Sequence, residues 1–556
     1  MYKRKLLLLT LVAAFQMSYA QKKPNIIYIM TDDHSYQTIS AYGSKVSKLA
    51  PTPNIDRLAK EGILFEKAFV ENSLCTPSRA ALMTGLYSHQ NGQKQLAEGI
   101  DSTKVFFSES LHDVGYQTAI VGKWHMSTSP KGFDYYNILD DQGKYYNPTF
   151  KSKMTNDKYV QEKGYATKLI TQHSLEFLNS RDKNKPFLLM VHHKAPHRNW
   201  MPELQYLNLY ENTEFPVPEN FWDDYVGKGV AAKNQKMTIS KDLELVQDLK
   251  VGELNAEAKT PYDKFSFMAL SGELDRLTPE ERVVWDKFYK PRNEKFLKAK
   301  LTGKELVLWK YQNYMRDYER VVKSVDDSVG EILDYLDKNP ELKENTIVVY
   351  TSDQGFYMGE HNYFDKRFMY EESFRTPLLM RYPKGIKAGT QSQALVQNID
   401  FAPTFISMAG AEKSPEMPGN TLEPLFSGKE PKDWRNSLYY HYYDYPAFHL
   451  VRKHDGVRTE RYKLIHFYGE GGLRAVKTKF QTTPGYREHR VLELLKKVDY
   501  IPEAQDINYN ELYDLKKDPN EMNNLYGKPG YEKITAELQT RLDQYRQDLN
   551  VTKDEY

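Results

Sequence analysis

Four short apolar segments in distant parts of the chain each end in a group of polar residues. The segments span residues 25–30, 118–121, 187–191 and 346–350. They are almost continuously hydrophobic, which is typical of strands buried on both faces of a mostly parallel sheet. Helical patterns lie between them, at residues 54–61, 166–181 and 311–338. Strands that alternate with helices predict the α/β class, here a large mixed, mostly parallel sheet sandwiched by helices.

The polar residues after these segments are acids, an amide, a lysine and histidines. In chain order they are Asp32 and Asp33, Lys123 and His125, His197, and Asp353 and Gln354. In open α/β sheets, ligands bind outside the carboxyl ends of the strands. One site built from four strand ends is therefore expected. A solvated polar loop would explain any one of these ends, but it does not explain all four together.

The acidic residues at two of the strand ends suit a metal ion. Asp32, Asp33, Asp353 and Gln354 offer only oxygen ligands, which hard divalent cations prefer. Two like charges about 4 Å apart repel by about 4 kcal/mol at an effective dielectric constant of about 20, so converging carboxylates require a cation. The spacing does not distinguish calcium from magnesium. An isolated Asp pair is also common as a helix cap or turn.

The chain is long enough for more than one domain. It has 556 residues, of which 40% are hydrophobic, so we expect a packed interior and two domains. Residues 21–433 are predicted to form the catalytic domain, and residues 202–300, rich in charge, Tyr and Trp, a helical insertion or lid. Residues 434–556 contain the alternating segments SLYYHYY and YKLIHFY, which predict a smaller α+β domain with an antiparallel sheet.

Residues 1–20 read as a signal peptide. Lys3, Arg4 and Lys5 precede an apolar run over residues 6–15, and Ala20 stands at the expected cleavage position. The run is shorter than the roughly 20 residues that span a bilayer, and no later segment is long enough to span one, so no membrane partner is expected. We expect a periplasmic or secreted protein. Its 77 Lys and Arg against 75 Asp and Glu give no overall attraction to nucleic acid.

The strongest local signal surrounds the single cysteine of the chain. Residues 73–85 read SLCTPSRAALMTG, and Pro77 suits the first turn of a helix, which places Cys75 at the helix N-terminus. Free N–H groups there favour an anionic nucleophile or a sulfate. Arg79, four residues on, projects from the same face. A structural cysteine beside a capped helix is the alternative.

These residues resemble the signature of the type I, formylglycine-dependent sulfatases of the alkaline-phosphatase-like superfamily. The resemblance rests on Cys75, Pro77, Ser78 and Arg79, followed by Thr84 and Gly85. It implies that a formylglycine-generating enzyme or an equivalent maturase oxidises Cys75 to formylglycine, whose hydrated aldehyde supplies the attacking oxygen. It also implies one calcium ion, held by Asp32, Asp33, Asp353, Gln354 and the modified Cys75.

The resemblance also implies roles for basic residues. Arg79, Lys123 and Lys366, which lies thirteen residues after Asp353, would stabilise the sulfate. His125 would contact the nucleophile, and His197 would assist the leaving oxygen, as suits a group with a pKa near neutral. Read without the resemblance, a Lys-x-His pair is usually a surface pair and a lone histidine is usually structural.

Residues 352–383 resemble carbohydrate sulfatases, particularly bacterial N-acetylglucosamine-6-sulfatases. This implies an exo-acting enzyme on 6-O-sulfated N-acetylglucosamine or glucosamine in heparan- or mucin-type glycans. Candidates for the substrate pocket are His361, His441, Tyr443 and Arg458, and His361 could equally be a packing residue. The alternatives are a sulfatase for another sugar, such as a 2-O-sulfated uronic acid, a phosphonate or phosphodiester hydrolase, and a noncatalytic glycan-binding relative.

Overall fold

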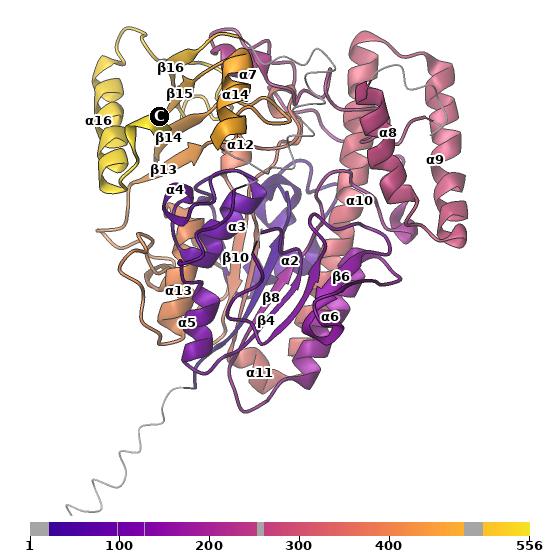
Figure 1. Ribbon diagram of the computed structural model, residues 1–556, viewed down its shortest axis with the longest axis vertical. Coiled ribbons are helices and arrows are strands. Elements are labelled where there is room, and N and C mark those ends of the chain that lie inside the picture. Colours follow the sequence, from indigo (N-terminus) through magenta and orange to yellow (C-terminus); the bar gives the residue numbers. More distant parts are fainter. Residues whose placement is uncertain (1–21, 97, 127, 253–260, 483–503) are drawn as a thin grey trace, which may run out of the picture.

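The computed structural model describes residues 22–96, 98–126, 128–252, 261–482 and 504–556 (Figure 1). The predicted signal peptide, residues 1–20, lies outside these residues. In the part of the chain that is described, no helix combines the length and the hydrophobicity needed to cross a membrane.

A ten-stranded mixed sheet forms the centre of the described chain, in the order β11-β2-β10-β9-β1-β8-β4-β5-β6-β7. The strands are β1 (Asn25–Thr31), β2 (Ile63–Phe65), β4 (Gln117–Gly122), β5 (Tyr135–Leu139), β6 (Thr149–Ser152), β7 (Tyr159–Gln161), β8 (Phe187–His192), β9 (Thr346–Ser352), β10 (Leu378–Arg381) and β11 (Thr390–Ser392). The central neighbours β9, β1, β8, β4 and β5 run parallel, whereas β10, β6 and β7 are antiparallel to their neighbours. The predicted mixed, mostly parallel sheet is confirmed.

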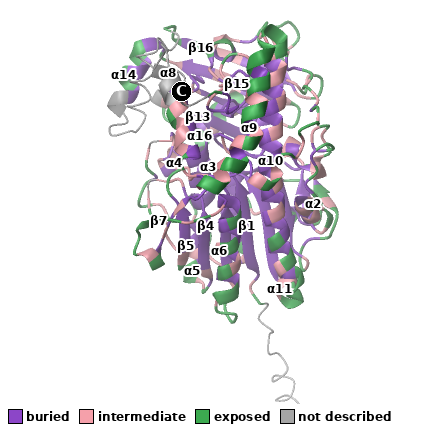
Figure 2. Cartoon of the chain, turned by 90° about the vertical axis from the view of Figure 1, so that its right-hand side faces the viewer, coloured by how far each residue is buried: buried purple, intermediate pink, exposed green. Residues whose placement is uncertain are grey.

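Alternate residues of the central strand β1 face two different helical layers. Ile27 and Ile29 share a hydrophobic cluster with residues of α6 (Ala166–Ser180) and α10 (Gly303–Asp337). Ile26 and Tyr28 share another with residues of α3 (Cys75–Thr84), α5 (Phe107–Asp113) and α13 (Phe401–Met408). Figure 1 shows the layers on either side of the sheet, and Figure 2 shows its central strands buried. Because both faces are covered, the strand is apolar throughout.

A second, antiparallel sheet lies near the C-terminus. It contains β13 (Ser437–Tyr442), β14 (His454–Thr459), β15 (Tyr462–Gly469) and β16 (Ile507–Asp514), paired in that order. Helix α16 (Glu532–Asp548) packs on one face, where its Leu538 and Leu542 join a cluster with Val457 and Leu464. The predicted C-terminal antiparallel sheet is thus present. We propose that the chain divides near residue 433, although both sheets contribute to the largest hydrophobic cluster.

The segment expected as an insertion, residues 202–300, is mainly helical where it is described. It contains α7 (Val230–Asn234), α8 (Pro261–Leu274) and α9 (Pro279–Ala299). Figure 1 shows α8 and α9 at one side of the molecule with α10, and Phe296 of α9 packs on Trp309 of α10. The other α-helices and strands of the described residues are α2 (Pro53–Lys60), α4 (Ser88–Asn91), α11 (Pro340–Glu344), α12 (Glu371–Phe374), α14 (Gly472–Thr482) and the short pair β3 (Ala68–Phe69) with β12 (Val396–Gln397).

One glycine allows two central strands to approach each other where they end. Gly122, the last residue of β4, has a φ of +101°, and a Cβ there would lie 2.0 Å from the backbone oxygen of His192 in β8. Lys123 N donates a hydrogen bond to that same oxygen at 2.7 Å. A side chain at residue 122 would therefore disturb the strand end that carries Lys123.

We predict that Gly122→Ala destabilises the protein more than Gly115→Ala. Both positions have positive φ, +101° and +94°, but a Cβ at Gly115 meets nothing within 4 Å. Both variants incur the backbone strain, about 1–3 kcal/mol, and only Gly122→Ala adds a steric clash of about 1–3 kcal/mol. Thermal unfolding midpoints measured side by side should be lower for Gly122→Ala, and equal midpoints would contradict this packing.

Candidate active site

The carboxyl ends of the central strands bring the predicted site residues to one edge of the sheet. In the register of the sheet, Thr31 pairs with Ser352, Met30 with His192, and Gly122 with His192. The loops that follow β1, β4, β8 and β9 therefore start side by side. This is the arrangement expected from the four apolar segments of the sequence.

Three buried carboxylates lie together at this edge. Oxygen atoms of Asp32, Asp33 and Asp353 lie within 4.8 Å of one another. Lys123 Nζ donates to Asp32, and Lys366 Nζ donates to both oxygens of Asp33 at 2.5 and 2.7 Å. Each of these two acids thus has a lysine partner that comes from a different loop.

Arg79 is the cationic partner of Asp353. Its Nε and Nη2 donate to Asp353 Oδ2 at 3.1 and 2.9 Å. Its Nη1 donates to the backbone oxygen of Lys123 at 2.9 Å, which ties α3 to the end of β4. The guanidinium is 1% exposed, so this pairing is made away from water.

The pKa values of the three acids show how strongly they depend on compensating charge. Burial, opposed by Lys366 and reinforced by Asp32, raises the pKa of Asp33 to about 6. Burial and the charge of Asp32 raise the pKa of Asp353 to about 8. Burial also acts to raise the pKa of Asp32, but Lys123, His197 and Arg79 together hold it well below its usual range. Another cation at the cluster would favour the ionised form of all three.

The cluster also presents oxygen atoms that accept no hydrogen bond from the described residues. Asp32 Oδ1 and Gln354 Oε1 are buried and accept no hydrogen bond from any described residue. Gln354 Nε2 donates to Asp33 and lies 3.9 Å from Cys75 Sγ. Unpartnered buried oxygens beside two further carboxylates suit a hard divalent cation. The residues present therefore fit the divalent-cation site that the strand ends of the sequence predict.

Cys75 is the first residue of α3 and lies within the same cluster. Its Sγ, a carboxylate oxygen of Asp32 and a ring nitrogen of His197 lie within 4.8 Å of one another. Burial, followed by the charge of Asp32, raises the pKa of the Cys75 thiol well above its usual range. The thiolate is therefore disfavoured, and an unmodified Cys75 would be a poor nucleophile.

The two predicted histidines line the same cluster with neutral rings. His197 Nδ1 donates to the backbone oxygen of Arg198 at 2.7 Å, so Nε2 is unprotonated and lies 3.8 Å from Asp33 Oδ2. Burial lowers the pKa of His197 well below its usual range. Burial, followed by the charge of Lys123, lowers the pKa of His125 in the same way.

Gln142 belongs to this group of residues, and the sequence analysis did not identify it. Its Oε1 accepts from Lys123 Nζ at 2.5 Å, and its Nε2 lies 2.9 Å from His125 Nε2. Since the amide nitrogen can only donate, His125 Nε2 must accept, and the ring carries its proton on Nδ1. The signal was present: residues 135–139 form a fifth apolar segment, β5, that also ends in polar residues.

The four candidates for substrate binding have other contacts. His361 Nδ1 lies 2.7 Å from Asp223 Oδ2. His441 stacks on Tyr443 at 3.7 Å between ring centroids, and its Nε2 lies 2.6 Å from the Tyr468 hydroxyl. Arg458 donates to Glu371 at 3.0 and 3.3 Å. Their described contacts do not include the Cys75 cluster, and a role in substrate binding stays a prediction.

Comparison with protein families identifies the class of protein that this fold and site define. The sulfatase family matches residues 24–411, and the C-terminal family of N-sulphoglucosamine sulphohydrolase matches residues 359–476 and 488–548. The chain belongs to the sulfatase family, as the residues around Cys75 predict. It is a sulfuric ester hydrolase with the fold of the alkaline-phosphatase-like proteins.

Individual relatives show a more specific similarity. The chain is 45% identical to an N-acetylglucosamine-6-O-sulfatase of Bacteroides thetaiotaomicron over 94% of this chain and 86% of that protein. It is 27% identical to the human N-acetylglucosamine-6-sulfatase, over 79% and 71%. A solved structure in complex with its substrate D-glucosamine-2-N,6-O-disulfate superposes with a TM-score of 0.84 at 44% identity, over 96% of this chain and 99% of that chain.

We predict that calcium stabilises protein from which divalent ions have been removed, and that it binds more weakly at lower pH. Binding requires ionised carboxylates, and the pKa values of Asp33 and Asp353 are about 6 and about 8. Calcium affinity should therefore fall at least about tenfold between about pH 8 and about pH 6. Titration calorimetry and thermal unfolding measure both effects.

Asp353→Asn should lose the stabilisation by calcium, whereas Asp113→Asn should keep it. The side chain of Asp113 is 81% exposed, unlike the buried carboxylates of the cluster, and serves as the control. An unfolding midpoint of the unsubstituted protein that does not respond to calcium would contradict the metal site.

We predict that Gln142→Ala lowers kcat for a sulfate ester by about 10- to 100-fold with little change in KM. The variant loses the acceptor for Lys123 and the donor that sets the tautomer of His125. Gln142→Glu keeps the acceptor but not that donor, so it should shift the pH profile of kcat as well. Gln391→Ala, in the exposed edge of β11, is the control. Unchanged kcat and pH profile in both Gln142 variants would show that the amide has no positioning role.

Proposed function

We propose that this protein removes sulfate from glycans, acting on terminal 6-O-sulfated N-acetylglucosamine or glucosamine of heparan- or mucin-type chains. The observation that carries the proposal is the gathering of three buried carboxylates and three cationic side chains around Cys75. The identity of 45% to an N-acetylglucosamine-6-O-sulfatase supports the choice of sugar and of sulfate position.

The cofactors that fit this site are formylglycine, made from Cys75, and one calcium ion. Asp32, Asp33, Asp353 and Gln354 would hold the ion together with residue 75. When present, calcium neutralises the carboxylates, and the formylglycine form of residue 75 supplies an oxygen nucleophile in place of a thiol. The raised pKa of the Cys75 thiol is consistent with a need for such a modification.

The cationic side chains supply the positive field that a sulfate group needs. Lys123, Lys366 and Arg79 reach the cluster from three different segments and are at most 3% exposed. Charges held in such a buried position interact strongly with a transferring anion, and they need no reorganisation during the reaction. We assign to these three residues the binding and orientation of the sulfate.

We assign proton transfer to the two histidines. Without substrate the neutral His197 offers an unprotonated Nε2 to the cluster. A bound anionic sulfate raises the pKa of this ring, so Nε2 can carry a proton next to the leaving sugar oxygen. The ring of His125 is oriented by Gln142, from which Nε2 accepts, so its proton lies on Nδ1, 3.4 Å from Thr76 Oγ1 in the first turn of α3.

We further propose that the protein is exported through residues 1–20 and acts in the periplasm or outside the cell in glycosaminoglycan breakdown. The export segment and the Cys75 signature come from the sequence. A formylglycine-generating enzyme or an equivalent maturase is then a required partner.

The direct test is a panel of substrates with the unsubstituted protein and Cys75→Ala. The protein should hydrolyse 6-O-sulfated N-acetylglucosamine in preference to a 2-O-sulfated uronic acid, a phosphonate or a phosphodiester. Cys75→Ala should lower kcat by at least ~10³-fold, because it removes the nucleophile. Its unfolding midpoint should stay close to that of the parent, since a small side chain at a helix start contributes little packing.

Three outcomes of this panel would overturn the proposal. They are a preference for the uronic acid sulfate, a preference for one of the phosphorus esters, and full activity in Cys75→Ala. If Cys75→Ala loses activity because it unfolds, Cys75→Ser, which keeps the size of the side chain, takes its place in the test.

A further inference from the structure

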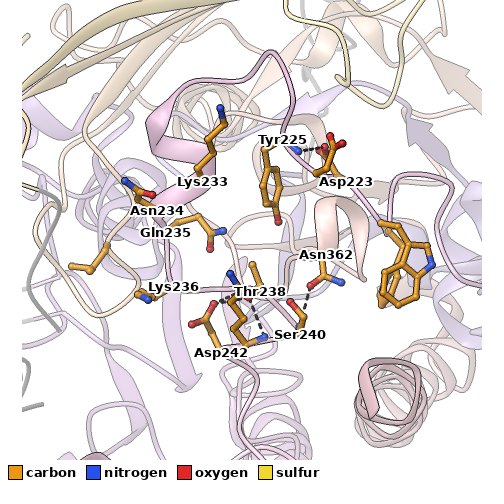
Figure 3. A pocket seen from close by; sticks show the side chains of 15 residues that line it. Asp223, Tyr225, Lys233, Asn234, Gln235, Lys236, Thr238, Ser240, Asp242 and Asn362 are labelled. Atoms are coloured by element: carbon orange, nitrogen blue, oxygen red, sulfur yellow. Dashed lines mark hydrogen bonds between the residues drawn. The ribbon is translucent and has the colours of Figure 1, made fainter. Parts of the chain in front are cut away.

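A second polar pocket lies next to the loop that carries Lys366. Its cavity volume is about 690 Å³, within the range of pockets that bind small ligands. Residues of the segment 221–242 form most of its lining, and Asn362 and Leu450 complete it (Figure 3). In Figure 3 the labelled side chains surround a central open space. None of the residues assigned above to sulfate or metal binding lines this pocket.

The lining combines aromatic faces with neutral hydrogen-bonding groups. Trp222 is 46% exposed, with Lys304 Nζ 5.1 Å from its ring centroid, and Tyr225, which stacks on Tyr363, also lines the pocket. Thr238, Ser240 and Asn362 add hydroxyl and amide groups. Aromatic rings provide flat apolar surfaces, and hydroxyl and amide groups both donate and accept hydrogen bonds. A sugar ring offers the complementary surfaces, with C–H groups on its faces and hydroxyl groups at its edge.

The charges of the pocket favour an anionic ligand. Asp223 is already paired with Lys228 Nζ at 2.9 Å and His361 Nδ1 at 2.7 Å. Asp242 accepts from Thr238 N and Oγ1 at 2.8 and 2.7 Å, and these neutral donors leave its negative charge in place. A third, Asp224, is exposed and accepts from Val226 N at 3.0 Å.

The lining contains three lysines, as many as its acids. They are Lys233, Lys236 and Lys241. Lys233 and Lys241 are exposed, and neither forms an ion pair with any residue of the described chain. Because Lys228 neutralises Asp223, these three lysines face only Asp224 and Asp242, which leaves a net excess of one positive charge toward a ligand. Sulfate groups on a sugar chain match that excess.

The pocket and the catalytic cluster share one stretch of chain. Asn362 accepts from Ile239 N at 2.7 Å through its backbone and from Ser240 N at 3.0 Å through its side chain. Phe364 N donates to Met237 O at 3.0 Å. Lys366, which contacts Asp33, lies four residues after Asn362, and four residues span at most about 14 Å. The pocket lining and the catalytic cluster are therefore close to each other along the backbone.

We propose that this pocket is a secondary binding site for a sulfated glycan chain, separate from the place where sulfate is removed. It holds sugar residues of the chain other than the one being desulfated, through Trp222, Lys233 and Lys241. The site rests on the proposed function, since it presumes that the substrate is a glycan chain.

The test compares a short and a long substrate in the double variant Trp222→Ala/Lys233→Glu. The expected result is a KM for a sulfated hexasaccharide that rises about 5- to 50-fold, from loss of an aromatic contact and reversal of one charge. The KM and kcat for 6-O-sulfated N-acetylglucosamine should not change, because the monosaccharide occupies the catalytic cluster alone. Tyr526→Ala/Lys528→Glu, an exposed aromatic and lysine in another segment, is the matched control.

A binding measurement separates failure of this site from failure of the proposed function. In a Cys75→Ala background, titration calorimetry with the sulfated hexasaccharide and with its desulfated form reports affinity without turnover. The pocket substitutions should lower the affinity for the sulfated hexasaccharide and have less effect on the affinity for its desulfated form. Unchanged affinity, or equal losses for the hexasaccharide and the monosaccharide, would overturn the secondary site. A parent protein that does not hydrolyse the monosaccharide would instead overturn the proposed function.

Discussion

Three carboxylates buried at one edge of a sheet are the constraint on which the rest of this site depends. Uncompensated charges in such a place would be expensive, so each acid has a cationic partner: Asp32 has Lys123, Asp33 has Lys366, and Asp353 has Arg79. Even so, the pKa values of Asp33 and Asp353 are raised to about 6 and about 8. A bound divalent cation would relieve this repulsion, and the three basic side chains would then be available to an anionic substrate. The same charges thus stabilise the resting protein and prepare it to bind sulfate.

The parallel sheet is what makes this concentration of charge possible. Its central strands end at one edge, so residues from four distant segments meet without long loops. The backbone at this edge is constrained, since Asp33 and His125 have φ values of 69° and 50°, which are uncommon for residues with a side chain. Such conformations persist where the surrounding structure enforces them, and they cluster at functional sites. Here they lie directly after β1 and β4.

Sequence patterns could predict the fold class and the central site because both depend on local signals that repeat. Each buried strand is an apolar segment, each is followed by reactive side chains, and Cys75 has a recognisable context. Gln142 was missed because it lies in a turn after a fifth strand whose polar end was not included. The contacts of the substrate-binding candidates in the C-terminal sheet depend on how segments that are distant in sequence pack together. His441 and Tyr443 do lie on one face of an extended segment, but they stack on each other, and Arg458 pairs with Glu371. No pattern in the sequence indicates those partners.

The central claim is that sulfate ester hydrolysis depends on a chemically modified residue 75 in this charged cluster. Mass spectrometry of the tryptic peptide covering residues 68–79, taken from a preparation with sulfatase activity, tests this most directly. The account predicts a peptide lighter than its unmodified form by the difference between a thiol and an aldehyde, in proportion to the specific activity. A fully active preparation whose residue 75 is entirely unmodified cysteine would contradict it.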